Sequence, residues 1–374
     1  MVVVRIAQVQ LYRYVLPFRR PPVIRGEELR SREGMLVKVT LEDGATAWGE
    51  AAPLPGHSRE SLADAERELR ELRAGVQGAQ IPAGLERLDG GFGNWLGHSW
   101  LTASVSVAME TAVLQLVAHR QGKSLHRLLC PNPRERITVN ALLSGSADEA
   151  FGQAERRKGE GFGAFKLKVG RRPFDEDIEA VRRVRETIGP RAKLRLDANR
   201  AFDIPTAIRF GQAAAPYDIE YIEEPVRSFL ELLELTHRGG FRLPVALDES
   251  LRTISPKALS QVRGVRAIVL KPTLLGFEWA MWFARRARRA GMLAVISSAY
   301  ESSLTLAMLA EIGACLNDGE AGENVAMGLD TQDALAEDLT VEPLRIAQGQ
   351  IDLSALPAGT FEVRPDRLGE PAHD

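Results

Sequence analysis

The sequence is poor in cysteine, and it lacks both long apolar runs and an excess of charge of one sign. Its two cysteines, Cys130 and Cys315, are too few for a disulfide framework, so we expect free thiols. We find no signal peptide and no apolar run of about 18 residues, which argues against export and membrane insertion. Lysine and arginine number 48 against 50 acidic residues, and no basic run indicates nucleic-acid binding. We therefore expect a cytoplasmic protein that binds neither membranes nor nucleic acid.

Five short apolar runs in the middle of the chain each end in a charged residue. These residues are Lys168, Asp197, Glu223, Asp248 and Lys271, and successive members lie 23 to 29 residues apart. Such a step accommodates one strand, one loop and one helix. The pattern predicts a modified (β/α)8-type barrel, written (β/α)7β, whose charged residues converge at one mouth. Further strands are predicted at 137–143, 293–298 and 324–330, and helices at 175–188, 205–214 and 277–290.

The first part of the chain has a different pattern, which predicts an α+β capping domain. Alternating apolar and polar residues predict strands, and longer stretches with helical spacing follow them. We expect the capping domain to span residues 1–130, the barrel 131–344, and a C-terminal segment, 345–374, to return to the capping domain. The long segment 17–34 and the turn 53–58 are candidates for a lid over the site. The predicted strands are 2–7, 35–40 and 45–50, and the predicted helices are 58–73 and 102–120.

Three acidic residues, Asp197, Glu223 and Asp248, end three consecutive predicted strands. At the rim of a barrel their carboxylates would lie close together and would repel one another unless something neutralises them. A divalent cation would do so, and a ligand set made only of oxygens favours Mg²⁺. The alternative is that each acid pairs with its own surface lysine or arginine.

Lysines are predicted on two opposite walls of the same barrel. Lys166 and Lys168 are two residues apart on one strand and therefore point to the same, interior side, whereas Lys271 ends the strand across the ring. Lysines close to a cation and to each other are expected to have lowered pKa values, which favours a neutral amine able to act as a base. A cation bound to a substrate carboxylate would stabilise the enediolate formed when the adjacent carbon loses its proton. The residues thus predict proton abstraction next to a carboxylate, unless the lysines are only counter-ions of the acids.

These residues resemble the enolase superfamily, and within it the o-succinylbenzoate synthase family. The resemblance covers most of the chain, in order and with similar spacing. The superfamily pattern is carried by Lys166-Leu167-Lys168, Asp197-Ala198-Asn199, Glu223-Glu224-Pro225, Asp248-Glu249-Ser250 and Lys271-Pro272, and the narrower one by Leu29–Gly34, Trp48-Gly49-Glu50, Pro53–Gly56, Arg195, Ser297-Ser298 and Gly328-Leu329-Asp330-Thr331.

The resemblance implies a lyase that dehydrates 2-succinyl-6-hydroxy-2,4-cyclohexadiene-1-carboxylate to o-succinylbenzoate, a step of menaquinone biosynthesis. The three acids would hold Mg²⁺, for which Mn²⁺ could substitute. Lys168 would remove the proton and return it to the leaving hydroxide, Lys271 would face the other side of the ring as a cation, and Lys166 would influence the charge of Lys168. The resemblance also implies that the substrate is contacted by Arg195, Asn199, Ser297, Ser298 and Gly328.

Several alternatives remain open from the sequence. An N-succinylamino acid racemase would use the same two lysine positions, alone or beside dehydration. A dipeptide epimerase fits less well, because the segment Met327–Asp330 lacks the Asp-x-Asp of those enzymes. A noncatalytic scaffold would have no reason to retain all three acids and the lysines. Ala299-Tyr300 and Met327 depart from the family pattern at the predicted barrel mouth, and the oligomeric state is left open.

Overall fold

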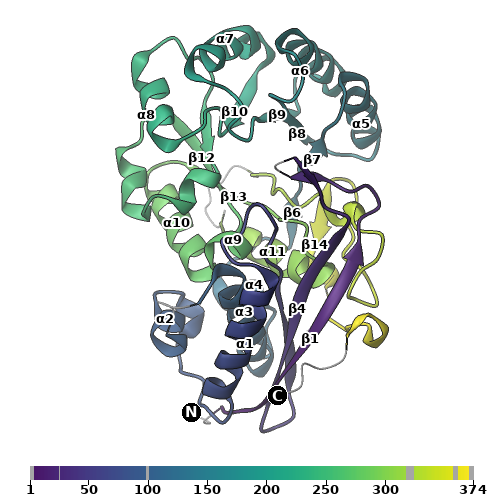
Figure 1. The fold of residues 1–374 in the computed structure, drawn as a ribbon, viewed down its shortest axis with the longest axis vertical. Helices are drawn as coiled ribbons and strands as arrows, with labels where there is room; N and C mark the ends of the chain where they lie inside the picture. Colours follow the sequence, from purple (N-terminus) through teal and green to yellow (C-terminus); the bar gives the residue numbers. More distant parts are fainter. Residues whose placement is uncertain (1–3, 25, 98–100, 317–323, 357–360, 370–374) are drawn as a thin grey trace.

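The computed structural model describes residues 4–24, 26–97, 101–316, 324–356 and 361–369. An antiparallel sheet with its helices lies at one end of the molecule, and a parallel barrel with helices outside it lies at the other (Figure 1). The predicted fold class, a modified (β/α)8-type barrel with an α+β capping domain, is confirmed, whereas the predicted domain boundaries stay predictions. Within the described part of the chain, every helix is too short or too polar to cross a bilayer.

The antiparallel sheet extends further than the sequence predicted. The predicted strand 2–7 starts only at Ile6 in the structure and continues to Pro17, while Val2 and Val3 lie outside the described residues. This strand pairs with the long strand β4 as far as the pair Pro17–Ser31. The loop between the two strands is therefore shorter than the predicted loop 17–34. The sheet has the order β1-β4-β5, formed by β1 (Ile6–Pro17), β4 (Ser31–Leu41) and β5 (Thr46–Ala51), and the loop carries the small hairpin β2 (Val23–Ile24) and β3 (Glu27–Glu28).

Helices cover one face of this sheet and connect it to the barrel. The predicted helix 58–73 starts later, at Leu62, because Ser61 is its N-cap: the Ser61 side chain accepts a hydrogen bond from Asp64 N, and the Asp64 side chain accepts one from Ser61 N. Helix α3 packs on β5 and on the barrel helix α9 (Pro272–Leu275). The helices here are α1 (Leu62–Val76), η1 (Leu85–Arg87), α2 (Gly91–Leu96), α3 (Ala103–Arg120) and α4 (Leu125–Leu129).

Within the described residues, the barrel is built from seven parallel strands in the order in which they occur along the chain. Most residues of these strands are buried, as expected for a sheet covered on both faces. The strands are β7 (Ala141–Leu143), β8 (Ala164–Lys168), β9 (Lys193–Asp197), β10 (Ile219–Glu223), β11 (Val245–Leu247), β12 (Val265–Leu270) and β13 (Leu293–Ile296).

The outer helices confirm the alternation of strand and helix that the sequence predicted. Helices were predicted at 175–188, 205–214 and 277–290, and each is present within one residue at either end. The helices are α5 (Ala147–Gly159), α6 (Phe174–Ile188), α7 (Ile204–Ala214), η2 (Ala215–Tyr217), α8 (Phe229–Arg238), η3 (Glu249–Arg252), η4 (Pro256–Gln261), α9, α10 (Phe277–Arg289) and α11 (Ser303–Leu316).

The predicted eighth strand is reduced to two bridging residues. Met327 bridges to Val139 and Gly328 bridges to Ser297, both in parallel orientation, so this segment joins β13 to the chain just before β7. The predicted strand 137–143 is split as well, because its first half, β6 (Arg136–Thr138), pairs with β14 (Gln350–Asp352). The ring of the barrel is therefore completed by a short segment that brings Gly328 to the mouth.

Part of the C-terminal segment packs on the first sheet. Val363 packs in a buried cluster with Tyr14, Leu16 and Leu36, which lie on β1 and β4. The backbone of Val341 also donates a hydrogen bond to Glu362 O. Short 3₁₀ turns complete this region at η5 (Gln332–Ala334), η6 (Leu353–Ala355) and η7 (Pro365–Arg367).

Candidate active site

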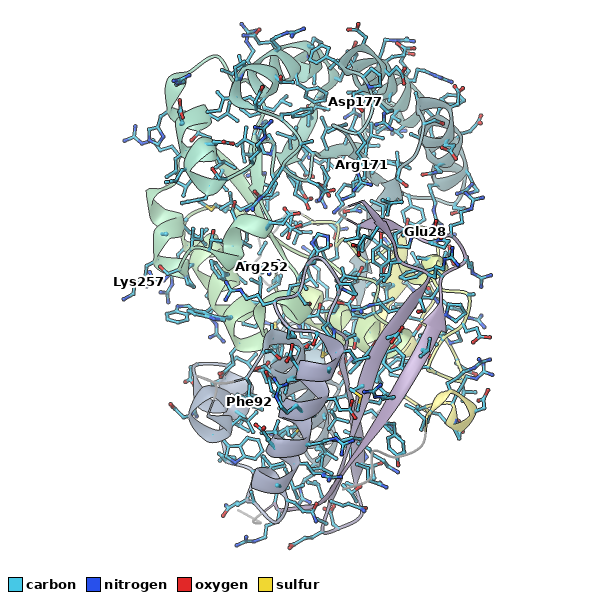
Figure 2. All side chains as sticks on the ribbon, viewed as in Figure 1. Glu28, Phe92, Arg171, Asp177, Arg252 and Lys257 are labelled. Atoms are coloured by element: carbon cyan, nitrogen blue, oxygen red, sulfur yellow. The ribbon has the colours of Figure 1, made fainter. Side chains whose placement is uncertain are left out.

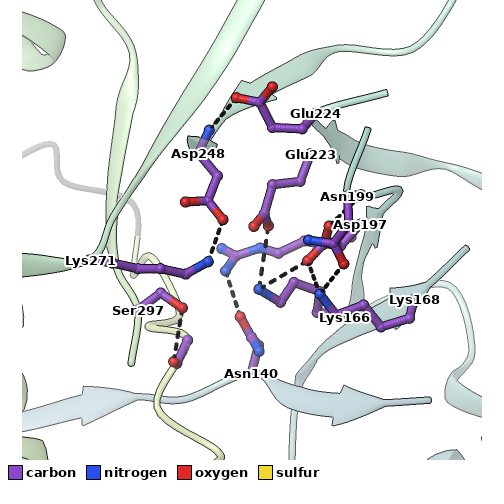
Figure 3. Close-up of polar contacts among 12 residues, drawn as sticks. Asn140, Lys166, Lys168, Asp197, Asn199, Glu223, Glu224, Asp248, Lys271 and Ser297 are labelled. Atoms are coloured by element: carbon purple, nitrogen blue, oxygen red, sulfur yellow. Dashed lines mark hydrogen bonds and ion pairs between the residues drawn. The ribbon is translucent and has the colours of Figure 1, made fainter. Parts of the chain in front are cut away.

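The charged residues singled out in the sequence gather at the carboxyl ends of the barrel strands. Lys166 and Lys168 lie on β8, and Asp197 and Glu223 are the last residues of β9 and β10. Asp248 and Lys271 follow directly after β11 and β12. Lys271 enters this cluster from one side and the two β8 lysines enter it from the other (Figure 3). The structure therefore brings these residues together at one end of the barrel, as the sequence predicted.

Each acid of the cluster lies next to a lysine. Lys168 Nζ donates hydrogen bonds to Asp197 Oδ2 at 2.5 Å and to Asn199 Oδ1 at 2.6 Å. Lys166 Nζ lies 3.4 Å from Glu223 Oε2 and 3.8 Å from Asp197 Oδ2. Lys271 Nζ forms an ion pair with Asp248 Oδ2. The acids therefore pair with lysines of the same cluster, which are mostly buried, and not with surface lysines or arginines.

The acids of the cluster differ in how readily they ionise. Burial, reinforced by the neighbouring Asp197 carboxylate, raises the pKa of Glu223 to about 8. Burial acts in the same direction on Asp197, but the lysines, led by Lys168, outweigh it and hold the Asp197 pKa well below its ordinary value. The group thus contains one carboxyl that is easily ionised and one that resists ionisation.

Nearby carboxylates raise the pKa values of two lysines in the structure. Burial alone would lower the pKa of Lys271, but the Asp248 and Glu249 carboxylates outweigh burial and raise it. Burial likewise opposes ionisation of Lys166, and Glu223 and Asp197 raise its pKa. Carboxylates are the nearest charges of these two lysines in the structure, whereas lowered pKa values were predicted for lysines beside a bound cation, so that prediction stays a prediction.

The donor set fits a hard divalent cation in its chemistry. As the side chains stand, no group of three acids, histidines or cysteines among the described residues is arranged to hold a metal ion. However, Glu223 Oε1 is buried and has no hydrogen-bond partner, and the same holds for Glu249 Oε2. A buried acceptor without a partner is costly, and an oxygen-binding cation would satisfy it. The acids are turned toward lysines that a cation would displace, which accounts for their present arrangement. The unpartnered Glu223 oxygen is therefore the feature that indicates a cation.

A buried hydrogen-bond network holds the acids in place from behind. The Glu224 carboxylate accepts hydrogen bonds from Asp248 N at 2.9 Å, from Ser250 N at 2.7 Å and from Ser250 Oγ at 2.8 Å. Arg200 Nε donates to the same carboxylate at 3.2 Å. Because these bonds fix the backbone on both sides of Asp248, Glu224 positions a neighbouring acid rather than facing the cavity.

A cavity of about 980 Å³ opens above the lysines, which is within the range typical of small-molecule sites. Lys166, Lys168 and Lys271 line it, together with residues of the β2–β3 hairpin and the turn near Leu54. These last two segments are the ones predicted to form a lid, and both lie on its wall. The buried acids Asp197, Glu223 and Asp248 are at most 6% exposed and lie behind the lysines.

Four of the five residues that the family resemblance assigns to substrate contact line this cavity. They are Asn199, Ser297, Ser298 and Gly328. Gly328 has no room for a side chain, because a Cβ would lie 2.7 Å from Ser297 Oγ. Their role as substrate contacts stays a prediction.

Arg195, the fifth of these residues, lies below the cavity and is 1% exposed. Its guanidinium donates to Glu220 Oε2 at 2.6 Å, to Ala326 O at 2.6 Å and to Asn140 Oδ1 at 3.1 Å. Asn140 itself lines the cavity. Within the described residues, Arg195 therefore reaches the cavity wall through Asn140.

Two residues of the site were not singled out from the sequence. Asn140 is a polar residue inside the apolar run 137–143, and that interruption was the available signal. Glu249 lines the cavity and accepts a hydrogen bond from Asn199 Nδ2 at 3.2 Å. Burial, reinforced by Asp248, raises the Glu249 pKa to about 7. Its signal in the sequence was a second acid directly after Asp248, but adjacency alone does not say which of two acids points inward.

Tyr300 and Ala299, two of the departures from the family pattern, line the cavity as well, whereas Met327 is buried in the barrel wall. Tyr300 makes an edge-to-face contact with Phe18, with ring centroids 5.5 Å apart. The residue directly after β1 therefore contacts the barrel at the mouth of the cavity through these two rings.

Comparison with known proteins agrees with this geometry. The family model described as Enolase C-terminal domain-like matches residues 149–366, and the one described as MenC, N-terminal domain matches residues 6–83. The o-succinylbenzoate synthase of Pectobacterium atrosepticum is 33% identical, over 88% of this chain and 91% of that protein. Protein PHYLLO, chloroplastic, of Arabidopsis thaliana is 32% identical over 91% of this chain, which spans only 22% of its length.

Among solved structures, the L-Ala-D/L-Glu epimerase of Bacillus subtilis has a TM-score of 0.81 at 23% identity, over 99% of this chain and 100% of that one. This likeness shows the fold, since the identity is low. The relatives and the first family model cover most of the chain. The chain therefore belongs to the o-succinylbenzoate synthase family of the enolase superfamily.

Proposed function

We propose that this enzyme dehydrates 2-succinyl-6-hydroxy-2,4-cyclohexadiene-1-carboxylate to o-succinylbenzoate with Mg²⁺, as a cytoplasmic step of menaquinone biosynthesis. The observation that carries the proposal is the placement of lysines on two sides of a carboxylate cluster, at the floor of one cavity. Relatives named o-succinylbenzoate synthase support the choice of reaction.

Asp197, Glu223 and Asp248 would hold the cation, and the unpartnered Glu223 Oε1 supports this assignment. Bound there, Mg²⁺, for which Mn²⁺ could substitute, would neutralise negative charge on the substrate carboxylate. The three acids come from consecutive strands, so their backbone positions are fixed by the barrel. Glu224 supports Asp248 through the backbone bonds described above.

Lys168 would act first as base and then as acid. Its amine removes the proton from the ring carbon that bears the carboxylate, and the electrons of that C–H bond enter the ring system. When the neighbouring C–O bond breaks, the Lys168 ammonium returns the proton to the departing hydroxide, which leaves as water. Asn199 Oδ1, 2.6 Å from Lys168 Nζ, orients the lysine for both transfers.

Lys271 would act from the other side of the ring without transferring a proton. Its ammonium attracts the negative charge that develops when the proton leaves, and it also favours the aromatic ring of the product through a cation–π interaction. Lys166, 3.4 Å from Glu223 Oε2, contributes a fixed positive charge beside Lys168.

The same pair of lysines could serve racemisation, which is the second candidate. A lysine on each face of a carbon next to a carboxylate can remove a proton from one face and return it from the other. An N-succinylamino acid would be the substrate of that reaction.

The test is to incubate the purified enzyme and Mg²⁺ with the cyclohexadiene substrate and to follow the aromatic product by ultraviolet absorbance. We expect Lys168→Ala and Lys271→Ala each to abolish turnover, with circular dichroism unchanged, and EDTA to stop the reaction until Mg²⁺ is restored. Lys193→Ala is the matched control, because it also removes a lysine that lies near an acid. Its Nζ is 3.8 Å from Glu220 Oε1, but its side chain is 60% exposed.

A parallel assay follows N-succinylamino acids in deuterated water by proton NMR. Exchange at the α-carbon without dehydration of the cyclohexadiene would favour the racemase, and near-normal dehydration by either lysine variant would refute the role given to that lysine.

A further inference from the structure

We propose that Arg171 binds the second carboxylate of the substrate, at the end of its succinyl tail, and thereby selects substrates that carry this charge. The inference rests on the proposed function, whose substrate has one carboxylate on the ring and one on the tail. The first is assigned to the metal site. The second needs a cation elsewhere in the cavity, since an unpaired charge in a partly closed site is costly.

Most of the other cations of the cavity wall already have an acidic partner. Lys166, Lys168 and Lys271 pair with acids of the cluster, and Arg200 pairs with Glu224. Arg171 also lines the cavity, and within the described part of the chain its guanidinium makes neither a hydrogen bond nor an ion pair. It is therefore a positive charge at the mouth that a ligand carboxylate can use without breaking a contact of the protein.

The loop that carries Arg171 is held firmly by its neighbours. Arg172 donates hydrogen bonds to Asp177 Oδ1 at 2.8 Å and to Lys168 O at 2.5 Å. Asp177, at the start of α6, also accepts a hydrogen bond from Gly170 N at 2.6 Å. Gly170 has a φ of +80°, which a residue with a side chain rarely adopts. These contacts tie the loop both to the end of β8 and to α6.

Arg171 is thus held on the same strand end as Lys168, a few residues further along the chain. In Figure 2 its label lies between that of Asp177 on α6 and that of Glu28 on the β2–β3 hairpin. Because the backbone of this loop is already fixed, ligand binding has to order only the Arg171 side chain, which favours a selective contact.

The wall near Arg171 is suited to the carbon chain of the tail. Tyr300 lies near enough to Arg171 to feel its charge. Burial raises the pKa of the Tyr300 hydroxyl, and the positive charges of Lys271 and Arg171 oppose that rise. Val23 and Ile24 of the β2–β3 hairpin line the same cavity. A short methylene chain could pack on these residues while its terminal carboxylate meets the guanidinium.

Arg59 is the competing cation, because it lines the cavity and has no acid partner among the described residues. Its guanidinium, however, donates to Arg252 O at 2.8 Å, so a ligand would have to share or break that bond. This makes Arg59→Met a matched comparison for Arg171→Met.

The experiment measures dehydration by the wild type, Arg171→Met, Arg171→Lys and Arg59→Met. Each enzyme is given the substrate and an analogue whose tail carboxylate is a primary amide. We expect Arg171→Met to raise KM for the substrate about 10- to 100-fold, as for a lost charge-assisted hydrogen bond, with kcat changed less than about threefold. Arg171→Lys should recover part of the loss, and Arg59→Met should leave KM within about twofold.

The decisive readout is the preference for carboxylate over amide in kcat/KM. The wild type should prefer the carboxylate by about 10-fold or more, and Arg171→Met should lose that preference, which a merely structural effect would not do. An undiminished preference in Arg171→Met overturns the inference, and loss of preference in Arg59→Met instead would assign the tail to Arg59. If the wild type does not dehydrate the substrate at all, it is the proposed function that fails.

Discussion

Glu110 provides a test of the packing between the first part of the chain and the barrel, away from the candidate site. It lies on α3, is 1% exposed, and its Oε2 accepts a hydrogen bond from Phe277 N at 3.0 Å, at the first residue of α10. Burial, reinforced by the nearby Glu278 carboxylate, raises the Glu110 pKa from an ordinary 4.5 to about 8. The carboxyl group is therefore protonated in the folded enzyme at neutral pH.

The sign of the pH effect follows from that shift. Between pH 4.5 and about 8 the folded state holds a proton on Glu110 that the unfolded state has lost, so folding takes up a proton. The contribution of Glu110 to the free energy of unfolding is complete below about pH 4.5 and falls by about 1.4 kcal/mol for each pH unit up to about 8. From pH 5 to 8 the loss amounts to about 4 kcal/mol.

Glu110→Gln keeps the shape and the acceptor oxygen but cannot ionise. We expect the variant to be about as stable as the wild type near pH 5 and more stable by about 4 kcal/mol at pH 8. Urea unfolding of both proteins, followed by tryptophan fluorescence at fixed ionic strength, measures the difference and cancels the other titrating groups. A difference that stays flat from pH 5 to 8 would refute the reasoning, because Glu110 would then titrate alike in the folded and unfolded states.

Two further predictions concern the first part of the chain. Gly49→Ala should destabilise the enzyme by about 3 kcal/mol or lead to insoluble protein, because the new Cβ would lie 1.8 Å from Ala108 O where β5 packs on α3; a melting temperature within about 2 °C of the wild type would contradict that packing. Ser61→Ala should cost about 1 kcal/mol by removing the N-cap of α1, measured by thermal unfolding, and Ser61→Asp should retain most of the stability; equal losses in both variants would mean that the cap bond is not the cause.

The barrel was predictable from the sequence because its strands are short, buried and followed at once by charges. The predicted strand at 293–298 contains the observed β13 (Leu293–Ile296). The length of β1 was not predictable in the same way, because its second half is stabilised by pairing with distant residues. Tyr14, for example, lies opposite Gly34, and a Cβ at Gly34 would lie 2.4 Å from the Tyr14 hydroxyl. That fit between a tyrosine ring on one strand and a glycine on the other leaves no local pattern in either segment.

The candidate site was predictable to the extent that it depends on position along a strand. Lys168 and Asp197 were placed correctly because the ends of parallel strands share one rim. The hydrogen-bond and ion-pair partners of each group were not predictable, since they depend on the directions of the side chains. Arg195 is an example, because the family resemblance assigned it to substrate contact while its guanidinium is occupied by Glu220. Glu224 is a second example. It accepts hydrogen bonds from the backbone around Asp248, whereas the adjacent Glu223 belongs to the acidic cluster.

Features that destabilise the fold are concentrated at the mouth of the barrel. Of the seven non-glycine residues with positive φ in the described part of the chain, four are at the site: Asn199, Arg200, Glu224 and Tyr300. Such conformations cost about 1 kcal/mol or more each and persist only where surrounding contacts enforce them. The unpartnered Glu223 oxygen adds to this cost. Because a divalent cation would satisfy the Glu223 oxygen and recover that part of the cost, its binding should raise the melting temperature of the wild type but not of Glu223→Gln, whose oxygen is a weaker ligand.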